Sequence, residues 1–336
     1  MFEDEDWESY TAVANMTGYN AVDIFSGSIE YDINGVPRLN GGIYSRAITI
    51  VGESTTGKTT LAVKLGASIV DRWNKLYGRE LADMHFKDIE DNTPIRRVKS
   101  LAGWSDIQLM SRLNHSATAC SVTDLFNEIR AIADVKEKLR KELTVKTGLR
   151  DIDGKEIEVF SPTVYIVDSI AALNADGIPE LEFDKSGNLK EVEKVAGNID
   201  AAREAKANTA FIKKVKSYLS KYNIILIMIN HITEEMSTSM YDVPMRFLTF
   251  LKPGQKLKGG KELVYQSFAI ISLALKTRIT DKDPIFGDSI RGSITALTFI
   301  KNKSNVEGIA IPMVFDQKTG YRPRYRDWET DRKSVV

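Results

Sequence analysis

The chain has 336 residues, 43% of them hydrophobic, which is enough to bury a full core in one large domain or two small ones. Lysine plus arginine and aspartate plus glutamate both number 46, so the net charge is zero. Bulk electrostatics therefore favour no partner, and any contact with nucleic acid must come from local basic patches.

The single cysteine, Cys120, excludes an internal disulfide and fits a reducing compartment. No apolar run reaches the roughly 18 residues that would suggest a membrane span. The acidic start MFEDEDWESY lacks the basic and apolar regions of a signal peptide. We therefore expect a cytoplasmic protein that has no membrane partner.

Strand-like and helix-like patterns alternate along the chain. Runs rich in valine, isoleucine and tyrosine predict strands at 47–51, 163–169, 223–230, 267–276 and 293–302. Helical periodicity predicts helices at 58–75, 121–143 and 200–221. The first three strand runs are almost continuously apolar, as expected of parallel strands covered on both faces. This order indicates an α/β fold with a mostly parallel central sheet flanked by helices, and the strands that close the chain indicate an antiparallel extension.

Two stretches interrupt this alternation. Residues 146–161 predict a short β-hairpin that turns at Asp153 and Gly154 and is inserted before the strand at 163–169. Residues 233–258 form a long segment without clear periodicity, and segments of that length are usually functional or disordered. The chain contains no internal repeat and no low-complexity tract, so we expect one core domain with elaborated loops.

The stretch GESTTGKTT has the pattern of a phosphate-binding loop, G-x-x-x-x-G-K-[ST], between a strand run and a helical pattern. Its residues are Gly52, Glu53, Ser54, Thr55, Thr56, Gly57, Lys58, Thr59 and Thr60. The glycines let successive backbone N–H groups and the helix N-terminus point at phosphates. Lys58 adds a positive charge on the phosphates, and the Thr59 hydroxyl is placed to bind Mg²⁺. The loop therefore predicts a nucleotide site.

Acidic residues complete a candidate site for hydrolysis. Asp168 lies at the end of a strand run, where ligands bind in open α/β sheets, and its carboxylate can hold Mg²⁺ together with Thr59. The alternative is that Asp168 only caps the following turn. Hydrolysis also needs a group that deprotonates water, and Asp88 and Glu90 follow a short strand-like patch. Glu90 is our candidate base, although spacing alone leaves that choice open.

Together these motifs resemble the RecA family of ATP-dependent strand-exchange recombinases, and the phage, UvsX-like branch most closely. The resemblance covers roughly residues 26–325. It is carried by SGSIEYDI (26–33), the phosphate loop, DIE (88–90), VYIVDSIAAL (164–173), IILIMINHI (224–232), the glycine pair 259–260, FIKNKS (299–304) and IPMVFDQKTG (311–320). The resemblance implies a RecA-type P-loop ATPase core that uses ATP and Mg²⁺.

The resemblance also implies roles for individual residues. It makes Glu90 the carboxylate that activates water. Asn230 and His231 match the family's sensor of the γ-phosphate, and His231 stands where the family often has glutamine; a neutral imidazole can donate the same hydrogen bond and adds a pH dependence. Lys301 and Lys303 match a pair that reaches across a filament interface to the neighbour's ATP, where cations stabilise developing phosphoryl charge.

Two segments match the DNA-binding loops of the family, at 174–198 and 233–258. The second interleaves basic and apolar residues, a mixture that follows a phosphate backbone and stacks on bases. Its candidate DNA-binding residues are Arg246, Phe247, Phe250, Lys252, Lys256 and Lys258. The first is acidic, which weakens the case for its direct contact with DNA.

The resemblance divides the chain into three parts. Residues 1–25 are a short N-terminal segment that could serve as an oligomerisation arm. Residues 26–325 are the ATPase core, in which the 146–161 hairpin is an insertion relative to RecA. Residues 326–336 are expected to be a non-native tail, because TDRKSVV reads like one translation frame of a sequencing adapter.

The expected activity is that of a DNA-dependent ATPase that forms filaments on single-stranded DNA and exchanges strands with double-stranded DNA, aided by single-strand-binding and loader proteins. One alternative is a hexameric replicative helicase of the DnaB type, which shares the core but usually carries a helical N-terminal domain. Another is a non-catalytic ATP-binding accessory protein, which the acidic first loop, the short N-terminus and the zero net charge keep open.

Overall fold

The computed structural model describes residues 13–31, 37–118, 120–150, 154–173, 181–183, 189–191, 198–234, 250–257, 261–283 and 287–322. The helices are α1 (Asn20–Ser26), α2 (Lys58–Tyr77), α3 (Ile95–Ala102), α4 (Asp106–Arg112), α5 (Val122–Lys138), α6 (Arg140–Leu143), α7 (Asn198–Lys221) and α8 (Lys261–Gln266), with a 3₁₀ turn at Ile170–Ala172. Within this described part, no helix combines the length and the apolar character needed to cross a membrane.

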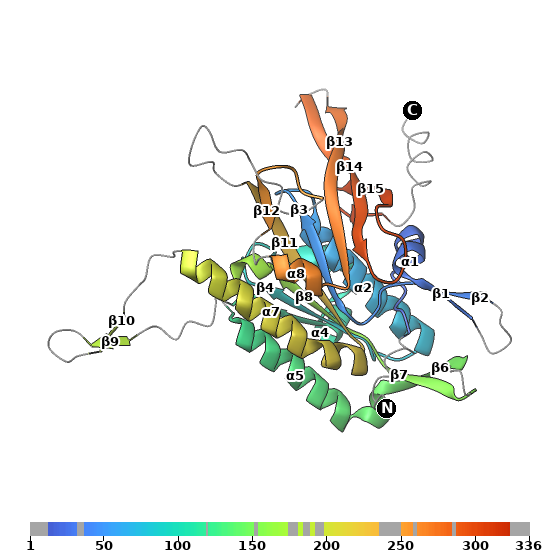
Figure 1. Cartoon of the computed structure of the whole chain (residues 1–336). Coiled ribbons are helices and arrows are strands. Elements are labelled where there is room, and N and C mark those ends of the chain that lie inside the picture. Colours follow the sequence, from blue (N-terminus) through green and yellow to red (C-terminus); the bar gives the residue numbers. More distant parts are fainter. Residues whose placement is uncertain are drawn as a thin grey trace.

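The strands of the central sheet are β3 (Ala47–Gly52), β4 (Asp83–Asp88), β5 (Leu113–Ser116), β8 (Thr163–Asp168), β11 (Ile224–Glu234), β12 (Gln255–Leu257), β13 (Ala269–Asp283), β14 (Gly287–Asn302), β15 (Ala310–Asp316) and β16 (Gly320–Tyr321). Their spatial order is β16-β15-β14-β13-β3-β11-β8-β4-β5, and β12 pairs with β11. Neighbouring strands from β13 to β5 run parallel, whereas β14, β15 and β16 continue the sheet antiparallel. The predicted α/β fold is confirmed (Figure 1).

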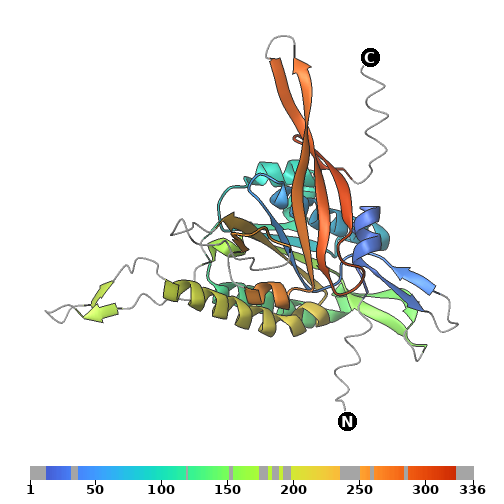
Figure 2. The same cartoon turned by 45° about the horizontal axis from the view of Figure 1, so that its top comes forward.

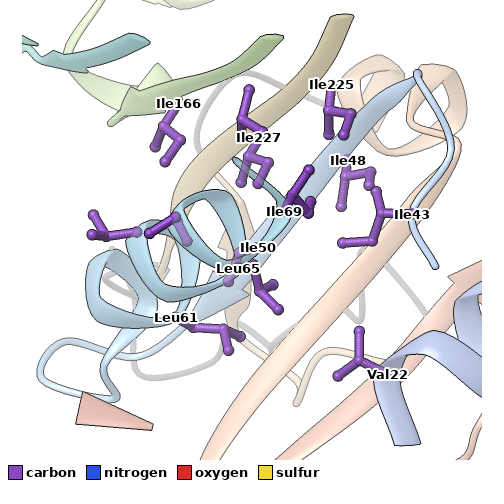
Figure 3. Packing of buried hydrophobic residues seen from close by; sticks show 14 of the residues in the cluster. Val22, Ile43, Ile48, Ile50, Leu61, Leu65, Ile69, Ile166, Ile225 and Ile227 are labelled. Atoms are coloured by element: carbon purple, nitrogen blue, oxygen red, sulfur yellow. The ribbon is translucent and has the colours of Figure 1, made fainter. Parts of the chain in front are cut away.

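Helices bury both faces of the parallel strands. On one face α2 and α3 pack on alternate strand residues, and Figure 3 shows Leu65 of α2 among Ile50 and Ile227. The residues between them, such as Leu226 and Met228, point to the other face and pack against α5 and α7. Because both faces are covered, these strands are apolar at most positions, which is the pattern that the sequence shows.

The antiparallel extension begins at β13. The run at 267–276 lies largely in this strand, which pairs parallel with β3 on one side and antiparallel with β14 on the other. The reason is topological: α8 returns the chain to the amino end of the sheet before β13 begins, so β13 runs in the same direction as β3. Beyond its pairing with β3, β13 continues with β14 as a long two-stranded ribbon that projects from the sheet (Figure 2).

Smaller strand pairs decorate the core. β6 (Thr144–Arg150) and β7 (Glu156–Phe160) form an antiparallel pair that overlaps the stretch 146–161, where the sequence predicts a hairpin, and begins two residues before it. β1 (Ser28–Tyr31) pairs with β2 (Pro37–Asn40), and β9 (Leu181–Phe183) pairs with β10 (Leu189–Glu191) inside the first candidate DNA-binding loop. The helix predicted at 121–143 is interrupted: α5 ends at Lys138, Leu139 has a non-helical backbone, and the single turn of α6 follows.

Candidate active site

The phosphate loop connects the carboxyl end of β3 to the amino end of α2. Gly57 has a left-handed φ of +84°, and a Cβ added there would lie 2.9 Å from the hydroxyl of Tyr321, so only glycine fits. The Thr56 hydroxyl donates to the carbonyl of Glu53 over 2.9 Å and closes the curve. The loop therefore has the curled backbone that a phosphate cradle requires.

Lys58 is buried beneath this loop. Its ammonium donates to the carbonyls of Gly52 over 3.1 Å and Glu53 over 2.8 Å. Burial lowers the pKa of Lys58, and the carboxylates of Asp168 and Glu90 oppose that shift. A cation held inside the loop by two neutral carbonyls is positioned to exchange them for phosphate oxygens.

Thr59 and Asp168 form a hydrogen-bonded pair in the site. The Thr59 hydroxyl donates to Asp168 Oδ2 over 2.5 Å. Burial raises the pKa of Asp168 to about 6, and repulsion from Glu90 and Asp88 adds to that shift. A hydroxyl and a desolvated carboxylate that stand beside each other at the carboxyl edge of the sheet are oxygen donors of the kind Mg²⁺ binds, so these residues fit that ion.

Glu90 lies in the turn that follows β4. The carboxylate of Asp88 closes this turn, because it accepts the backbone N–H of Asn92 over 3.3 Å and of Thr93 over 2.7 Å. The backbone N–H of Ile89 donates to the Asp168 carbonyl over 2.7 Å and ties the turn to the end of β8. Asp88 thus has a structural role, which leaves Glu90 as the acidic side chain facing the site.

Three donors surround the Glu90 carboxylate. The Ser169 hydroxyl donates to Oε1, His231 Nε2 lies 3.1 Å from the same oxygen, and Asn92 donates to Oε2 over 3.2 Å. Partial burial by itself would raise the pKa of Glu90, but these hydrogen bonds and the nearby imidazole outweigh it and lower the pKa below the usual value. Glu90 is therefore ionised near neutral pH, as a general base must be.

Asn230 and His231 reach the site from β11. In the parallel register they stand beside Val51 and Gly52, where β3 ends and the phosphate loop begins. Asn230 is fully buried, and its side-chain oxygen accepts the backbone N–H of His231 over 2.8 Å. The structure thus brings Lys58, Thr59, Asp168, Glu90, Asn230 and His231 together at one edge of the sheet.

Lys301 and Lys303 do not join this cluster. Lys301 pairs with Ile270, which stands beside Thr49 and therefore before the loop end of β3. Its ammonium donates to the carbonyls of Val264 and Tyr265 at the end of α8, each over 2.8 Å. Burial and the nearby Lys303 lower the pKa of Lys301 to about 8. Their contact with a neighbour's ATP stays a prediction.

The candidate DNA-binding residues are only partly described. Phe250 packs against a small apolar cluster that includes Leu251 and Leu257, and Lys252 Nζ lies 3.8 Å from the Glu53 carboxylate of the phosphate loop. Lys256 lies on β12. Arg246, Phe247 and Lys258 lie outside the described residues, as do most of segment 174–198, residues 1–12 and the tail 326–336.

Sequence reasoning missed three residues of the site. Ser169 and Asn92 stand one and two positions from predicted site residues, so their polar side chains were the available signal. No sequence signal marked Tyr321, because its partner is distant in the chain. Its hydroxyl donates to the Thr56 carbonyl over 2.9 Å across a sequence separation of 265 residues. Tyr19 donates in turn to the Tyr321 carbonyl over 3.0 Å. The strand β16, which carries Tyr321, thus supports the phosphate loop through the hydrogen bond to the Thr56 carbonyl.

The fold and this site define an α/β core with a phosphate loop and a mostly parallel central sheet, which is consistent with a RecA-type core. No protein-family model matches the chain. The chain is 25% identical over 287 residues to Protein RecA of Geobacter metallireducens and 24% identical over 282 residues to Protein RecA of Mycoplasmopsis pulmonis, which covers 85% and 84% of this chain. It spans only 62% and 63% of the length of these curated relatives. These similarities support a RecA-family relationship.

Proposed function

We propose that this chain is a DNA-dependent ATPase that forms filaments on single-stranded DNA and promotes homologous pairing and strand exchange in recombination and repair. One observation carries the proposal: the carboxyl ends of β3, β4, β8 and β11 gather a phosphate-loop lysine, a hydroxyl–carboxylate pair and a hydrogen-bonded Glu90–His231 pair. The similarity to two proteins named RecA supports the same conclusion.

Each side chain has a defined part in the proposed hydrolysis. Lys58 exchanges the Gly52 and Glu53 carbonyls for phosphate oxygens of ATP. Glu90 accepts the proton of the attacking water while Ser169 and Asn92 orient its carboxylate. Thr59 and Asp168 would hold Mg²⁺, which neutralises phosphate charge when bound.

Coupling to DNA follows from the path of β11. After His231 this strand continues to Glu234, and β12 pairs with it through Ile232 and Leu257, and Thr233 and Lys256. The candidate DNA-binding segment 233–258 is therefore attached at both ends to the strand that carries His231. A change at His231 when ATP binds would reach this segment directly, provided that ATP binds the two arrangements with different affinity.

The finer parts of the proposal concern partners and origin. In a filament, Lys301 and Lys303 would approach the ATP of the next subunit. Double-stranded DNA would be the exchange partner, with single-strand-binding and loader proteins assisting. We place the chain in the phage, UvsX-like branch, acting in the cytoplasm of a bacterial host.

The test is ATP hydrolysis with and without single-stranded DNA across a salt series. We expect stimulation by DNA that falls as salt rises, because phosphate contacts release counterions. Stimulated hydrolysis by rings instead of helical filaments in electron micrographs would favour the DnaB-type helicase. ATP binding without DNA binding at any low salt would favour the accessory protein.

A further inference from the structure

A nitrogen ligand stands among the carboxylates of the site. Glu90 follows β4, Asp168 ends β8 and His231 lies on β11, so three parallel strands deliver these side chains to one place. One ligand atom of each lies within 4.8 Å of the other two, and His231 Nε2 is 3.1 Å from Glu90 Oε1. One imidazole and two carboxylates that converge in this way can bind a single metal ion together.

The spacing and the atom types select the kind of ion. Two ligands bound tetrahedrally at about 2.0–2.1 Å from Zn²⁺ are roughly 3.3 Å apart, close to the His231–Glu90 separation. An imidazole with two carboxylates suits Zn²⁺ and its first-row neighbours, whereas Mg²⁺ prefers oxygen alone. The set is therefore different from the Thr59–Asp168 pair that fits Mg²⁺, although Asp168 belongs to both.

Hydroxyl groups already orient the two carboxylates. Ser169 donates to the same Glu90 oxygen that faces His231, and Thr59 donates to Asp168 Oδ2 over 2.5 Å. Such outer contacts fix the direction of metal ligands and strengthen binding. The side chains of Glu90 and His231 are 27% and 30% exposed, so an ion can enter from solvent and keep a water ligand.

We propose that Glu90, Asp168 and His231 form a binding site for a transition-metal dication such as Zn²⁺, and that occupancy of this site stops ATP hydrolysis. The ion takes the place of the hydrogen bond between His231 and Glu90. It occupies the lone pair that Glu90 needs to accept a proton from water, and it links β11 to the turn after β4 across the end of β8. The binding stands by itself, whereas the inhibition rests on the proposed function.

The first experiment measures Zn²⁺ binding to the full chain by calorimetry, without nucleotide and in excess Mg²⁺. We expect one Zn²⁺ per chain. His231→Gln should weaken binding by at least about tenfold, the lower end of what even an outer-contact change costs. Glu90→Gln, which also removes a ligand, should do the same and provides a second variant if His231→Gln does not fold by circular dichroism.

The control variants cover every other histidine and cysteine of the chain, because the sequence contains three histidines and one cysteine. His85→Gln, His115→Gln and Cys120→Ser should each bind Zn²⁺ as the wild type does. The proposal is overturned if the wild type binds no Zn²⁺, if His231→Gln and Glu90→Gln bind it unchanged, or if one of the control variants removes binding.

The second experiment adds Zn²⁺ to Mg²⁺-dependent ATP hydrolysis. Hydrolysis by the wild type and by a His85→Gln/His115→Gln double variant should fall at the Zn²⁺ concentration that saturates the site, and a chelator should restore it. Binding without inhibition would overturn the inhibitory role. If the chain hydrolyses no ATP with or without DNA, the proposed function fails while the binding result still decides the metal site.

Discussion

Two buried lysines lie at opposite ends of the parallel strands. Lys58 lies at the carboxyl edge and Lys136 at the amino edge, where its ammonium donates to the carbonyls of Ser161 and Tyr222, just before β8 and β11. Each lysine donates to two backbone carbonyls, and burial lowers the pKa of each. By residue type, burial and bonding pattern the two are nearly alike.

Their surroundings differ. Lys58 lies in a glycine-containing loop, and the carboxylates of Asp168 and Glu90 lie nearby. A bound phosphate would pair with the lysine, and a bound cation would pair with the carboxylates. Lys136 ties a helix to the starts of two strands, and Asp83 is the carboxylate that supports its charge. The comparison teaches that a buried lysine is a functional candidate only where the groups around it still need a ligand.

The largest expected effect separates binding from turnover at the carboxyl edge. Lys58→Ala should abolish nucleotide binding, because it removes the cation of the phosphate loop. Glu90→Gln should bind ATP normally and lose about 10²–10⁴-fold in kcat, since it removes the base. Fluorescent ATP titration and phosphate release measure the two quantities.

The pair of variants contains its own control. If Lys58→Ala and Glu90→Gln lose binding and turnover to the same extent, the separate roles of the two residues are wrong. Lys136→Met, at the other edge, should bind ATP with the wild-type affinity.

We expect the stability of the protein to depend on pH through Lys136, which lies at the amino ends of the parallel strands. Burial lowers the pKa of Lys136 from 10.5 to about 8, so between these values the unfolded chain holds a proton that the folded chain has lost. The free energy of unfolding contributed by this group therefore rises with pH across that window, by about 3 kcal/mol in total. Denaturant unfolding of wild type and Lys136→Met at several pH values should show that difference, and parallel curves would contradict it.

A smaller effect is expected behind the phosphate loop. Tyr321→Phe removes the hydrogen bond to the Thr56 carbonyl, a loss of about 1 kcal/mol, or roughly fivefold in affinity. The KM for ATP should rise with little change in kcat, because the loop is loosened while Glu90 is untouched. Tyr19→Phe, one hydrogen bond further away, is the matched control and should change KM less. An equal change in both, or a fall in kcat alone, would argue against support of the loop by Tyr321.

The smallest effect concerns the segment that we propose binds DNA. Lys252 is exposed and its ion pair with Glu53 contributes little, so Lys252→Ala should leave stability unchanged. If Lys252 contacts a phosphate, the variant should reduce the salt slope of single-stranded DNA binding by about 0.7. Lys75→Ala, on the exposed end of α2, should keep the wild-type slope, and identical slopes in all three proteins would exclude Lys252 from the interface.

The sequence by itself determined the elements whose signal is local. The phosphate loop is one contiguous stretch, and the strands at 47–51, 163–169 and 223–230 are almost continuously apolar because helices cover both faces. The proximity of Thr59 and Asp168 follows from the sequence as well, because the strand ends and the phosphate loop meet at the carboxyl ends of parallel strands. These inferences needed only residue type and periodicity.

The tertiary structure alone decided which distant side chains touch. It made β13 parallel to β3, directed Lys301 to the carbonyls of α8, set Tyr321 beneath the phosphate loop and joined His231 to the oxygen of Glu90 that also accepts from Ser169. The physical reason is that such contacts depend on strand order, crossover direction and register between segments that are distant in the sequence, for which a local sequence pattern carries no signal.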